Sequence, residues 1–312
     1  MPRSGISDII WGLVTYDPGG SLMHRSSLLL AAGVLILATA CAPEETATPP
    51  AAAPSGTASA ADACAKESLK LITPGKLTIG TDKPAYEPWF KDDDPANGQG
   101  FEGAVAAAVA KGLGFTPQEV AWETVPFDSS FAPGPKKFDF DINQISITPE
   151  RAKAVDFSEG YYTVKQAVVT LGDSKFAAAA NLAALKDAKI GVQVGTTALS
   201  AVREVIQPGV DPSVFNQQID AVNALKNEQI DAIVVDLPTA FYVTAAQVEG
   251  SKIVGQFASS SGAPEEFGLL FEKGNTLVSC VNKALAELKS SGELAKIEQQ
   301  WLTAAAGAPE LS

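Results

Sequence analysis

Short apolar runs alternate with helix-like segments through most of this chain, and that alternation limits its fold more than any other feature of the sequence. We expect a buried strand at residues 77–81, followed by apolar side chains at helical spacing from Phe101 to Leu113. Strands and helices then alternate at 189–195, 196–206, 214–218, 221–229, 230–236 and 238–247, and two helices, 277–289 and 293–302, end the series. Such alternation favours an α/β fold with parallel sheets.

Four residues lie just past the ends of expected strands: Asp82, Arg151, Gly195 and Asp236. Ligands of parallel α/β sheets bind at the carboxyl ends of the strands, so these residues are candidates for one site. Arg151 follows Thr148, a good helix cap, and its planar fork of five donors matches a carboxylate. The pattern therefore predicts a ligand site at these strand ends, in which Arg151 can hold a carboxylate; a solvent-exposed Arg151 on a surface helix is the alternative.

Composition excludes several classes of function. The net charge of −13 argues against nucleic-acid binding, which needs basic patches. The one histidine, His24, lies in the N-terminal leader described next, so Ser/His and Cys/His catalytic pairs and His-based zinc sites are excluded from the rest of the chain. The run Asp92-Asp-Asp94 lacks the spacing of a calcium loop. We expect no metal and no cofactor.

The first forty residues have the layout of a secretory signal. A basic start, Met23-His-Arg25, precedes ten apolar residues at 28–37, too few to span a bilayer as a permanent helix. Cys41 follows small residues, which resembles the site where bacterial lipoproteins are lipidated and cleaved. We expect residues 1–40 to be removed, with Met23 as the true start, and the mature protein to be anchored outside the cell membrane through Cys41. A cleaved signal without lipid remains the alternative.

A linker joins this expected anchor to the globular part. Of the 21 residues from 42 to 62, eighteen are Ala, Pro, Thr, Ser or Gly, so the segment cannot bury a core. We assign residues 41–63 to the lipidated cysteine and a disordered linker. The remaining two cysteines, Cys64 and Cys280, are expected to form a disulfide in an exported protein, with two free thiols as the alternative.

Residues 76–302 resemble the family 3 solute-binding proteins, which are polar amino acid receptors of ABC importers. The resemblance rests on these ordered segments: Leu77-Thr-Ile-Gly-Thr-Asp82, Gly100-Phe-Glu-Gly103, Ile147-Thr-Pro-Glu-Arg151, Val155-Asp-Phe-Ser158, Tyr161-Tyr162, Gly191-Val-Gln-Val-Gly-Thr196, Ile230-Asp-Ala-Ile-Val-Val-Asp236, Phe267-Gly268 and Trp301. It implies a two-lobe fold of the periplasmic-binding-protein type II, with two hinge strands and a ligand cleft between the lobes. The implied first lobe spans 65–163 plus 263–303, and the second spans 166–259.

The resemblance also implies roles for particular residues. Arg151 would hold the carboxylate of a free amino acid, and Asp236, from the opposite lobe, would hold its ammonium. Ser146, Thr196 and Thr197 would help to hold the same carboxylate.

Further positions surround the ligand's side chain in the same family. Tyr86 and Phe127 fall where aromatic rings sandwich it, and ordinary core packing is the alternative for both. Asp82 falls where its distal group is contacted, which would favour a basic or amide side chain. Asn143 and Gln144 replace the small residues common at their positions and add polar groups to the pocket, and Gln193 departs from the basic residue found there in some members.

These expectations describe an extracytoplasmic binding lipoprotein rather than an enzyme. It would capture a polar or basic L-amino acid, such as glutamine or arginine, act as a monomer, and present the ligand to the transmembrane subunits of an ABC permease. Two alternatives remain. One is an amino acid sensor. The other is an enzyme on the same scaffold, similar to cyclohexadienyl dehydratase, for which Asp82 is the only candidate general acid.

Overall fold

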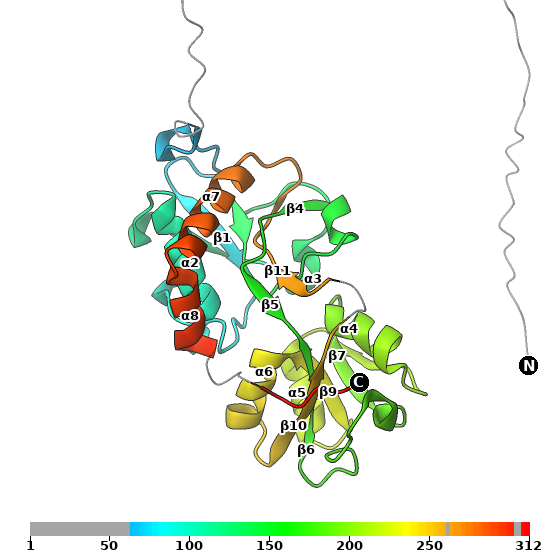
Figure 1. Cartoon of the computed structure of the whole chain (residues 1–312). Coiled ribbons are helices and arrows are strands. Elements are labelled where there is room, and N and C mark those ends of the chain that lie inside the picture. The colour runs from blue at the N-terminus through cyan, green and yellow to red at the C-terminus, as the bar shows by residue number, and fades with distance from the viewer. Residues whose placement is uncertain (1–62, 260–262, 303–306) are drawn as a thin grey trace, which may run out of the picture. The chain divides into compact units, whose positions relative to one another are not determined.

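The computed structural model describes residues 63–259, 263–302 and 307–312 (Figure 1). The expected signal, Cys41 and all but the last residue of the expected linker lie outside these ranges. Within them, no helix is both long and apolar enough to cross a membrane.

The first lobe is built on a five-stranded sheet in the order β2-β1-β3-β12-β4. These strands are β1 (Leu77–Thr81), β2 (Val120–Thr124), β3 (Phe140–Asp141), β4 (Val155–Phe157) and β12 (Leu270–Glu272). Strand β1 runs parallel to β2 and β3, whereas β12 runs antiparallel to β3 and β4. Three helices pack together beside this sheet: α2 (Phe101–Gly112), α7 (Leu277–Ser290) and α8 (Glu293–Leu302) (Figure 1). Its core combines aliphatic residues with large buried aromatic residues, among them Trp89, Phe90, Phe101, Phe140, Phe267 and Phe271.

The second lobe has its own five-stranded sheet in the order β10-β6-β9-β7-β8. Its strands are β6 (Gln166–Leu171), β7 (Ile190–Gln193), β8 (Ser213–Phe215), β9 (Ala232–Asp236) and β10 (Ser251–Phe257), and its α-helices are α4 (Thr197–Ala201), α5 (Gln218–Lys226) and α6 (Leu237–Tyr242). Alternate residues of β6 and β9 enter separate apolar clusters, with Val168 and Val234 in one and Val169 and Val235 in the other. Both faces of this sheet are therefore buried, as apolar strands of this kind require.

Two short strands connect the lobes. Strand β5 (Tyr162–Val164) pairs antiparallel with β11 (Glu265–Phe267), and Figure 1 shows this pair between the two larger sheets. The fold is thus the expected two-lobe α/β architecture with two crossing strands.

Several expected helices are shorter or end differently. The segment after β7 forms α4 and then the π-helical turn η7 (Val202–Ile206), and α6 continues into a second such turn, η8 (Val243–Gln247). The short α3 (Phe127–Ser130) follows β2, and the remaining turns are η1 (Lys66–Ser68), η2 (Lys91–Asp93), η3 (Pro95–Asn97), η4 (Pro117–Glu119), η5 (Arg151–Lys153) and η6 (Leu182–Leu185). The expected helix at Arg151 is thus one 3-10 turn, in which the Thr148 hydroxyl accepts the Arg151 N–H at 3.2 Å.

Two long-range links involve the ends of the described region. Cys64 and Cys280 form the expected disulfide, which joins the start of the fold to α7. At the other end, the N–H of Leu311 donates to Gln256 of β10 at 2.8 Å, and the Leu311 side chain is buried in the second lobe. No sequence pattern predicted that residues 307–312, which follow α8 of the first lobe, would contact the second lobe.

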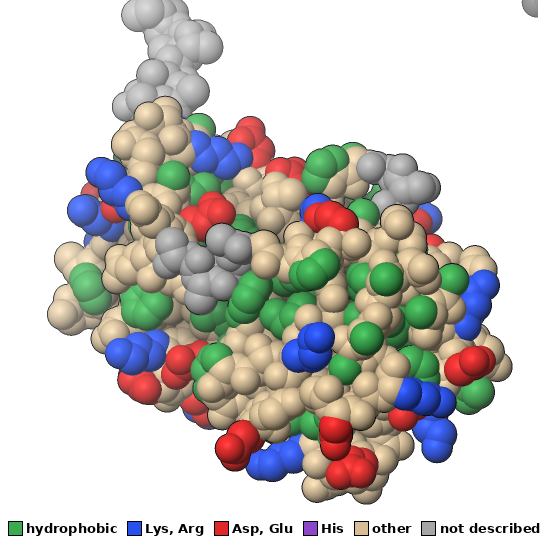
Figure 2. All heavy atoms as spheres, turned by 60° about the horizontal axis from the view of Figure 1, so that its bottom comes forward, with side chains coloured by type: hydrophobic (Ala, Val, Ile, Leu, Met, Phe, Trp, Pro, Cys, Tyr) green, Lys and Arg blue, Asp and Glu red, His purple; other side chains and the backbone are tan. Residues whose placement is uncertain are grey.

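Charged side chains are dispersed on the surface that Figure 2 shows. Lys and Arg lie among Asp and Glu on this face, and no large area of it is basic alone. This distribution agrees with the acidic net charge of −13.

Candidate ligand-binding site

A small cavity lies between the lobes, with a volume of about 50 Å³. Nine of the eleven predicted site residues line it: Asp82, Tyr86, Phe127, Asn143 and Gln144 from the first lobe, and Gln193, Thr196, Thr197 and Asp236 from the second. Gln218 and Ala221 at the start of α5 also line it and were not predicted. Ser146 and Arg151 are not in the lining and lie against Thr197 and Gly195 instead.

Asp82 follows the last residue of β1 and organises the first-lobe side of the cavity. Its Oδ1 accepts the N–H of Lys83 at 2.7 Å, and its Oδ2 accepts the N–H of Phe127 at 3.1 Å. Burial raises the pKa of Asp82, and these two hydrogen bonds oppose the shift. Asp82 therefore positions the Phe127 backbone as well as lining the cavity.

Gln144 is held by the buried carboxylate of Glu102, a residue that was not among the predicted site residues. The backbone of Gln144 has a φ of 49°, in the left-handed region, and its N–H donates to Glu102 Oε1 at 2.6 Å. The Gln144 amide and the Tyr161 hydroxyl also donate to Glu102. Complete burial raises the pKa of Glu102 to about 7. Glu102 belongs to the Gly100–Gly103 segment of the family resemblance, which was the only signal for it.

Asp141 adds a third acidic group behind this side of the cavity. It lies on β3, is fully buried, and neither carboxylate oxygen has a hydrogen-bond partner among the described residues. Burial, and then the charges of Glu102 and Asp82, raise the pKa of Asp141 well above its usual range. A Cβ on Gly80 would lie 2.6 Å from Asp141 Oδ2, which explains the glycine on the neighbouring strand.

Arg151 bridges the two lobes through backbone carbonyls. Its Nη1 donates to the carbonyl of Ser146 at 2.7 Å, and its Nη2 donates to the carbonyl of Gly195 at 2.8 Å. The guanidinium also lies over the rings of Phe131 and Phe127, at 4.6 Å and 5.5 Å from their centroids. Burial lowers the pKa of Arg151 to about 10, so the group stays charged at neutral pH.

Asp236 ends β9 in the second lobe, and its charge and that of Arg151 act on each other's pKa. The amide of Gln166, which is fully buried, donates to Asp236 Oδ1 at 2.8 Å and to Glu265 Oε2 at 3.4 Å. Burial, followed by the charge of Glu265, raises the pKa of Asp236 to about 8. Asp236 therefore needs a cation beside it to ionise fully at neutral pH.

Glu265, on the crossing strand β11, was also missed. Its Oε1 accepts the hydroxyl of Thr197 at 2.6 Å and the hydroxyl of Ser146. The only sequence signal was its place two residues before the Phe267-Gly268 marker. Ser146, Thr197 and Glu265 thus form one polar cluster beside the Arg151 guanidinium.

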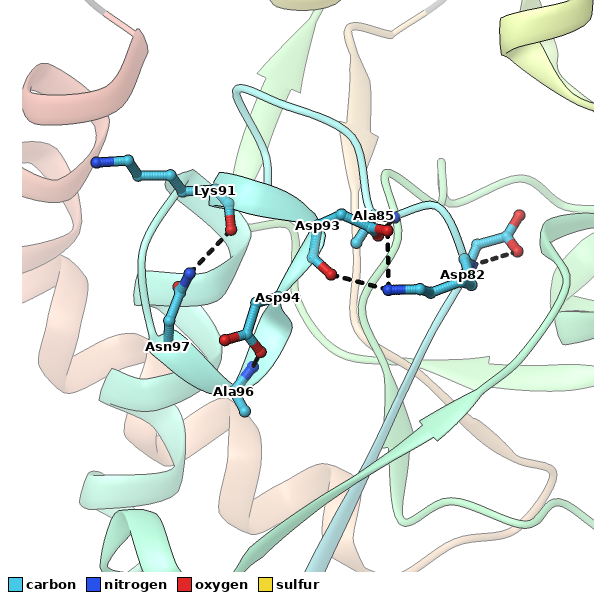
Figure 3. A network of polar contacts seen from close by, with 8 residues as sticks. Asp82, Ala85, Lys91, Asp93, Asp94, Ala96 and Asn97 are labelled. Carbon is cyan, nitrogen blue, oxygen red and sulfur yellow. Dashed lines mark hydrogen bonds and ion pairs between the residues drawn. The ribbon is translucent and has the colours of Figure 1, made fainter.

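In the acidic loop at residues 92–94, the carboxylates of Asp93 and Asp94 contact residues close to them in sequence (Figure 3). Asp93 accepts the N–H of Ala85 at 2.6 Å and pairs with Lys83 at 2.8 Å, and Asp94 accepts the N–H of Ala96 at 3.1 Å. Figure 3 shows that the Asp82 carboxylate points away from this loop. Across the described ranges, no group of three or more His, Cys, Asp or Glu side chains is arranged to hold a metal ion.

Comparison with known proteins gives a consistent result. The family model of the bacterial extracellular solute-binding proteins, family 3, matches residues 77–304. The arginine-binding extracellular protein ArtP of Bacillus subtilis (strain 168) is 30% identical over 236 residues, which cover 73% of this chain and 86% of that protein. The L-cystine-binding protein TcyJ of Escherichia coli (strain K12) is 31% identical over 239 residues, covering 75% and 85%.

Solved structures are similar in fold over most of the chain. An ancestral arginine-binding protein bound to arginine has a TM-score of 0.62 and 35% identity, and the match covers 73% of this chain and 98% of that chain. The ancestral amino acid-binding protein AncCDT-1, described as a precursor of cyclohexadienyl dehydratase, has a TM-score of 0.61 and 31% identity, with coverages of 73% and 95%.

Proposed function

Because the chain belongs to family 3 of the bacterial extracellular solute-binding proteins, we propose that it captures a polar or basic L-amino acid between its lobes and delivers it to the permease of an ABC importer. One observation carries this proposal: nine predicted ligand contacts, from both lobes, line a single cavity with acidic groups at two of its sides.

The α-groups of an amino acid match charged and polar groups that come from both lobes. Asp236 offers a carboxylate to the ammonium, and Arg151 with the hydroxyls of Ser146 and Thr197 offers donors to the carboxylate. Each charged hydrogen bond contributes about 1.5–3 kcal/mol. A micromolar ligand needs about 8 kcal/mol in total, so a few such contacts and two aromatic rings suffice.

The first-lobe side favours a cationic side chain. Asp82 lines it, and Glu102 and Asp141 lie behind it in the protein interior. The positive charge of Lys136 opposes the raised pKa of Asp141. The Lys136 amine itself donates to the carbonyl of Ser130 at 2.7 Å. Because burial raises the pKa of all three carboxyl groups, a guanidinium or ammonium beside them would stabilise their ionised forms, whereas an acidic side chain would disfavour those forms.

Entry of the ligand requires the lobes to separate. A cavity of about 50 Å³ holds a few water molecules and not an amino acid. We propose that residues 65–163 with 263–303 move as one body and residues 166–259 as the other, with β5 and β11 as the hinge. Ligand free energy would then shift the equilibrium toward closure.

An enzyme on this scaffold is the second candidate, because Asp236 and Asp82 both have raised pKa values beside the cavity. Binding is the simpler use, since Asp236 and Arg151 come from opposite lobes and suit the ammonium and the carboxylate of one amino acid. Turnover of prephenate or arogenate by the purified protein would support the enzyme instead.

The proposed location of the protein rests on residues outside the described ranges. We propose that Cys41 is lipidated and that residues 42–62 tether a monomeric binding domain above the membrane, within reach of the permease. Signalling through another membrane partner would use the same closure.

Calorimetry with L-arginine and L-citrulline tests the proposed specificity, because citrulline replaces the guanidinium by a neutral group of similar shape. We expect arginine to bind at least about tenfold more tightly, and Asp82→Asn to remove most of that preference. Asp128→Asn is the matched control, since Asp128 is an exposed neighbour outside the cavity lining. Absence of binding for all twenty amino acids would refute amino acid capture, and equal affinities would refute only the preference for a cation.

A further inference from the structure

We infer that Glu265 is an internal competitor of the ligand: its carboxylate takes the hydroxyl donors of Ser146 and Thr197 that would otherwise hold the ligand's carboxylate, and it thereby lowers the affinity of the site. This inference rests on the proposed function, and it assigns a role in setting affinity to a residue of the crossing strand.

The contacts of Glu265 place it at the carboxylate-binding side. It lies on β11, opposite Val164 of β5, so its backbone belongs to the connection between the lobes. Its Oε1 accepts from Thr197 of the second lobe at 2.6 Å and from Ser146 of the first lobe. The two hydroxyl oxygens are 3.4 Å apart, so one carboxylate oxygen serves both.

Hydrogen-bond capacity makes this arrangement competitive. A hydroxyl has a single proton to donate, so neither Ser146 nor Thr197 can donate to Glu265 and to a ligand at the same time. The charge of Glu265 also acts on Arg151, whose pKa it raises. With a ligand bound, Arg151 would have to neutralise two carboxylates, that of Glu265 and that of the ligand. Like charges this close repel each other. The ligand's carboxylate therefore gains these donors only when Glu265 gives them up.

The remaining contact of Glu265 is weak enough to permit such an exchange. Its Oε2 accepts from the Gln166 amide at 3.4 Å, a long hydrogen bond, and Gln166 donates to Asp236 at 2.8 Å as well. The Glu265 side chain is half-buried, so a rotamer change can move it toward solvent. Because Oε2 has only this long hydrogen bond and the contacts of Oε1 are to hydroxyl groups, the Glu265 carboxylate can be displaced without breaking the fold.

The next residue supplies a matched control. Glu266 carries the same charge on the same strand, but its side chain points to the opposite face and is exposed. A change at Glu266 alters the net charge as a change at Glu265 does, and it leaves the Ser146 and Thr197 hydroxyls untouched. The two positions therefore separate local competition from a general charge effect.

Calorimetry on the wild type, Glu265→Gln, Glu265→Ala and Glu266→Gln, with L-arginine and L-glutamine as probes, tests the inference. We expect both Glu265 variants to bind the better probe at least about tenfold more tightly, the factor that one charge-assisted hydrogen bond represents, and Glu266→Gln to bind as the wild type does. Unfolding midpoints show that each variant is folded, and two different replacements guard against a defect peculiar to one of them.

A second probe identifies the group that competes. The amide of the better probe keeps the ammonium but replaces the carboxylate by a neutral group, so the Glu265 variants should gain clearly less for the amide than for the acid. Unchanged affinity for the acid would overturn the inference. Weaker binding would also overturn it and would make Glu265 an acceptor for the ligand's ammonium. An equal gain for acid and amide would overturn competition for the carboxylate donors. Failure of the wild type to bind any amino acid would instead refute the proposed function.

Discussion

Amino acid binding should release a substantial fraction of a proton at pH 7, and Asp236 is the expected source. The pKa of Asp236 is raised to about 8, so about 90% of the group is protonated at pH 7 in the unliganded protein. An ammonium beside a carboxylate lowers the carboxylate pKa by about 1–3 units. The expected release is therefore between about 0.4 and 0.9 proton per ligand at pH 7.

The same linkage fixes the direction of the pH dependence. Because the bound state holds fewer protons than the free state, rising pH favours binding. Between pH 6 and pH 8 the affinity should increase by about 5-fold to 50-fold for a fall in pKa of 1 to 3 units, and it should level off above pH 8.

Calorimetry in two buffers measures the release directly. The observed enthalpy in Tris, which takes up protons with a large enthalpy, should differ from that in phosphate, where this enthalpy is small, and the difference gives the number of protons. Glutamine is the suitable ligand, since its neutral side chain leaves Glu102 and Asp82 undisturbed. Asp236→Asn should bind more weakly and show no difference between buffers.

Two outcomes would refute the reasoning. Identical enthalpies in both buffers for the wild type would mean that Asp236 is already ionised or stays protonated beside the ligand. Proton release that persists in Asp236→Asn would assign the proton to another group.

Two further predictions concern stability and location. Glu102 binds its proton more tightly in the folded state than in the unfolded state, so wild-type stability should fall by roughly 3 kcal/mol from this group alone as pH rises from 4 to 8. Glu102→Gln should lower stability at acidic pH and flatten this dependence in denaturant titrations, and an unchanged slope would contradict the assignment. Cys41→Ser should move the protein from the membrane fraction to the soluble fraction, and unchanged partitioning would rule out the lipid anchor.

Strand and helix periodicity predicted the α/β class because sheets buried on both faces require continuous apolar strands. The same local logic located Asp82 and Asp236 at strand ends. The other seven predicted residues that line the cavity with them came from the ordered segments of the family resemblance. The disulfide was predictable as well, since only two cysteines remain after Cys41. In each case a short stretch of sequence, or a count of one residue type, carried the information.

Other features had no local signal. In the sequence, Gln166 is one polar residue at the start of an apolar run. Only the structure shows that it is buried and donates a hydrogen bond to Asp236. The predicted helix at Arg151 is a single turn because Val155 immediately begins β4. Arg151 was expected to hold a ligand carboxylate, and in the structure two of its nitrogens donate to backbone carbonyls of both lobes. Its role toward a ligand stays a prediction.

The sequence by itself determined the order of strands and helices, the acidic character of the chain and the residue types that could meet a zwitterion. Each depends on neighbours in sequence or on composition. Only the tertiary structure decided that Glu265 accepts from Ser146, 119 positions away, and from Thr197, 68 positions away. Hydrogen bonds depend on distances of about 3 Å, and no periodicity encodes a distance between residues that different strands bring together.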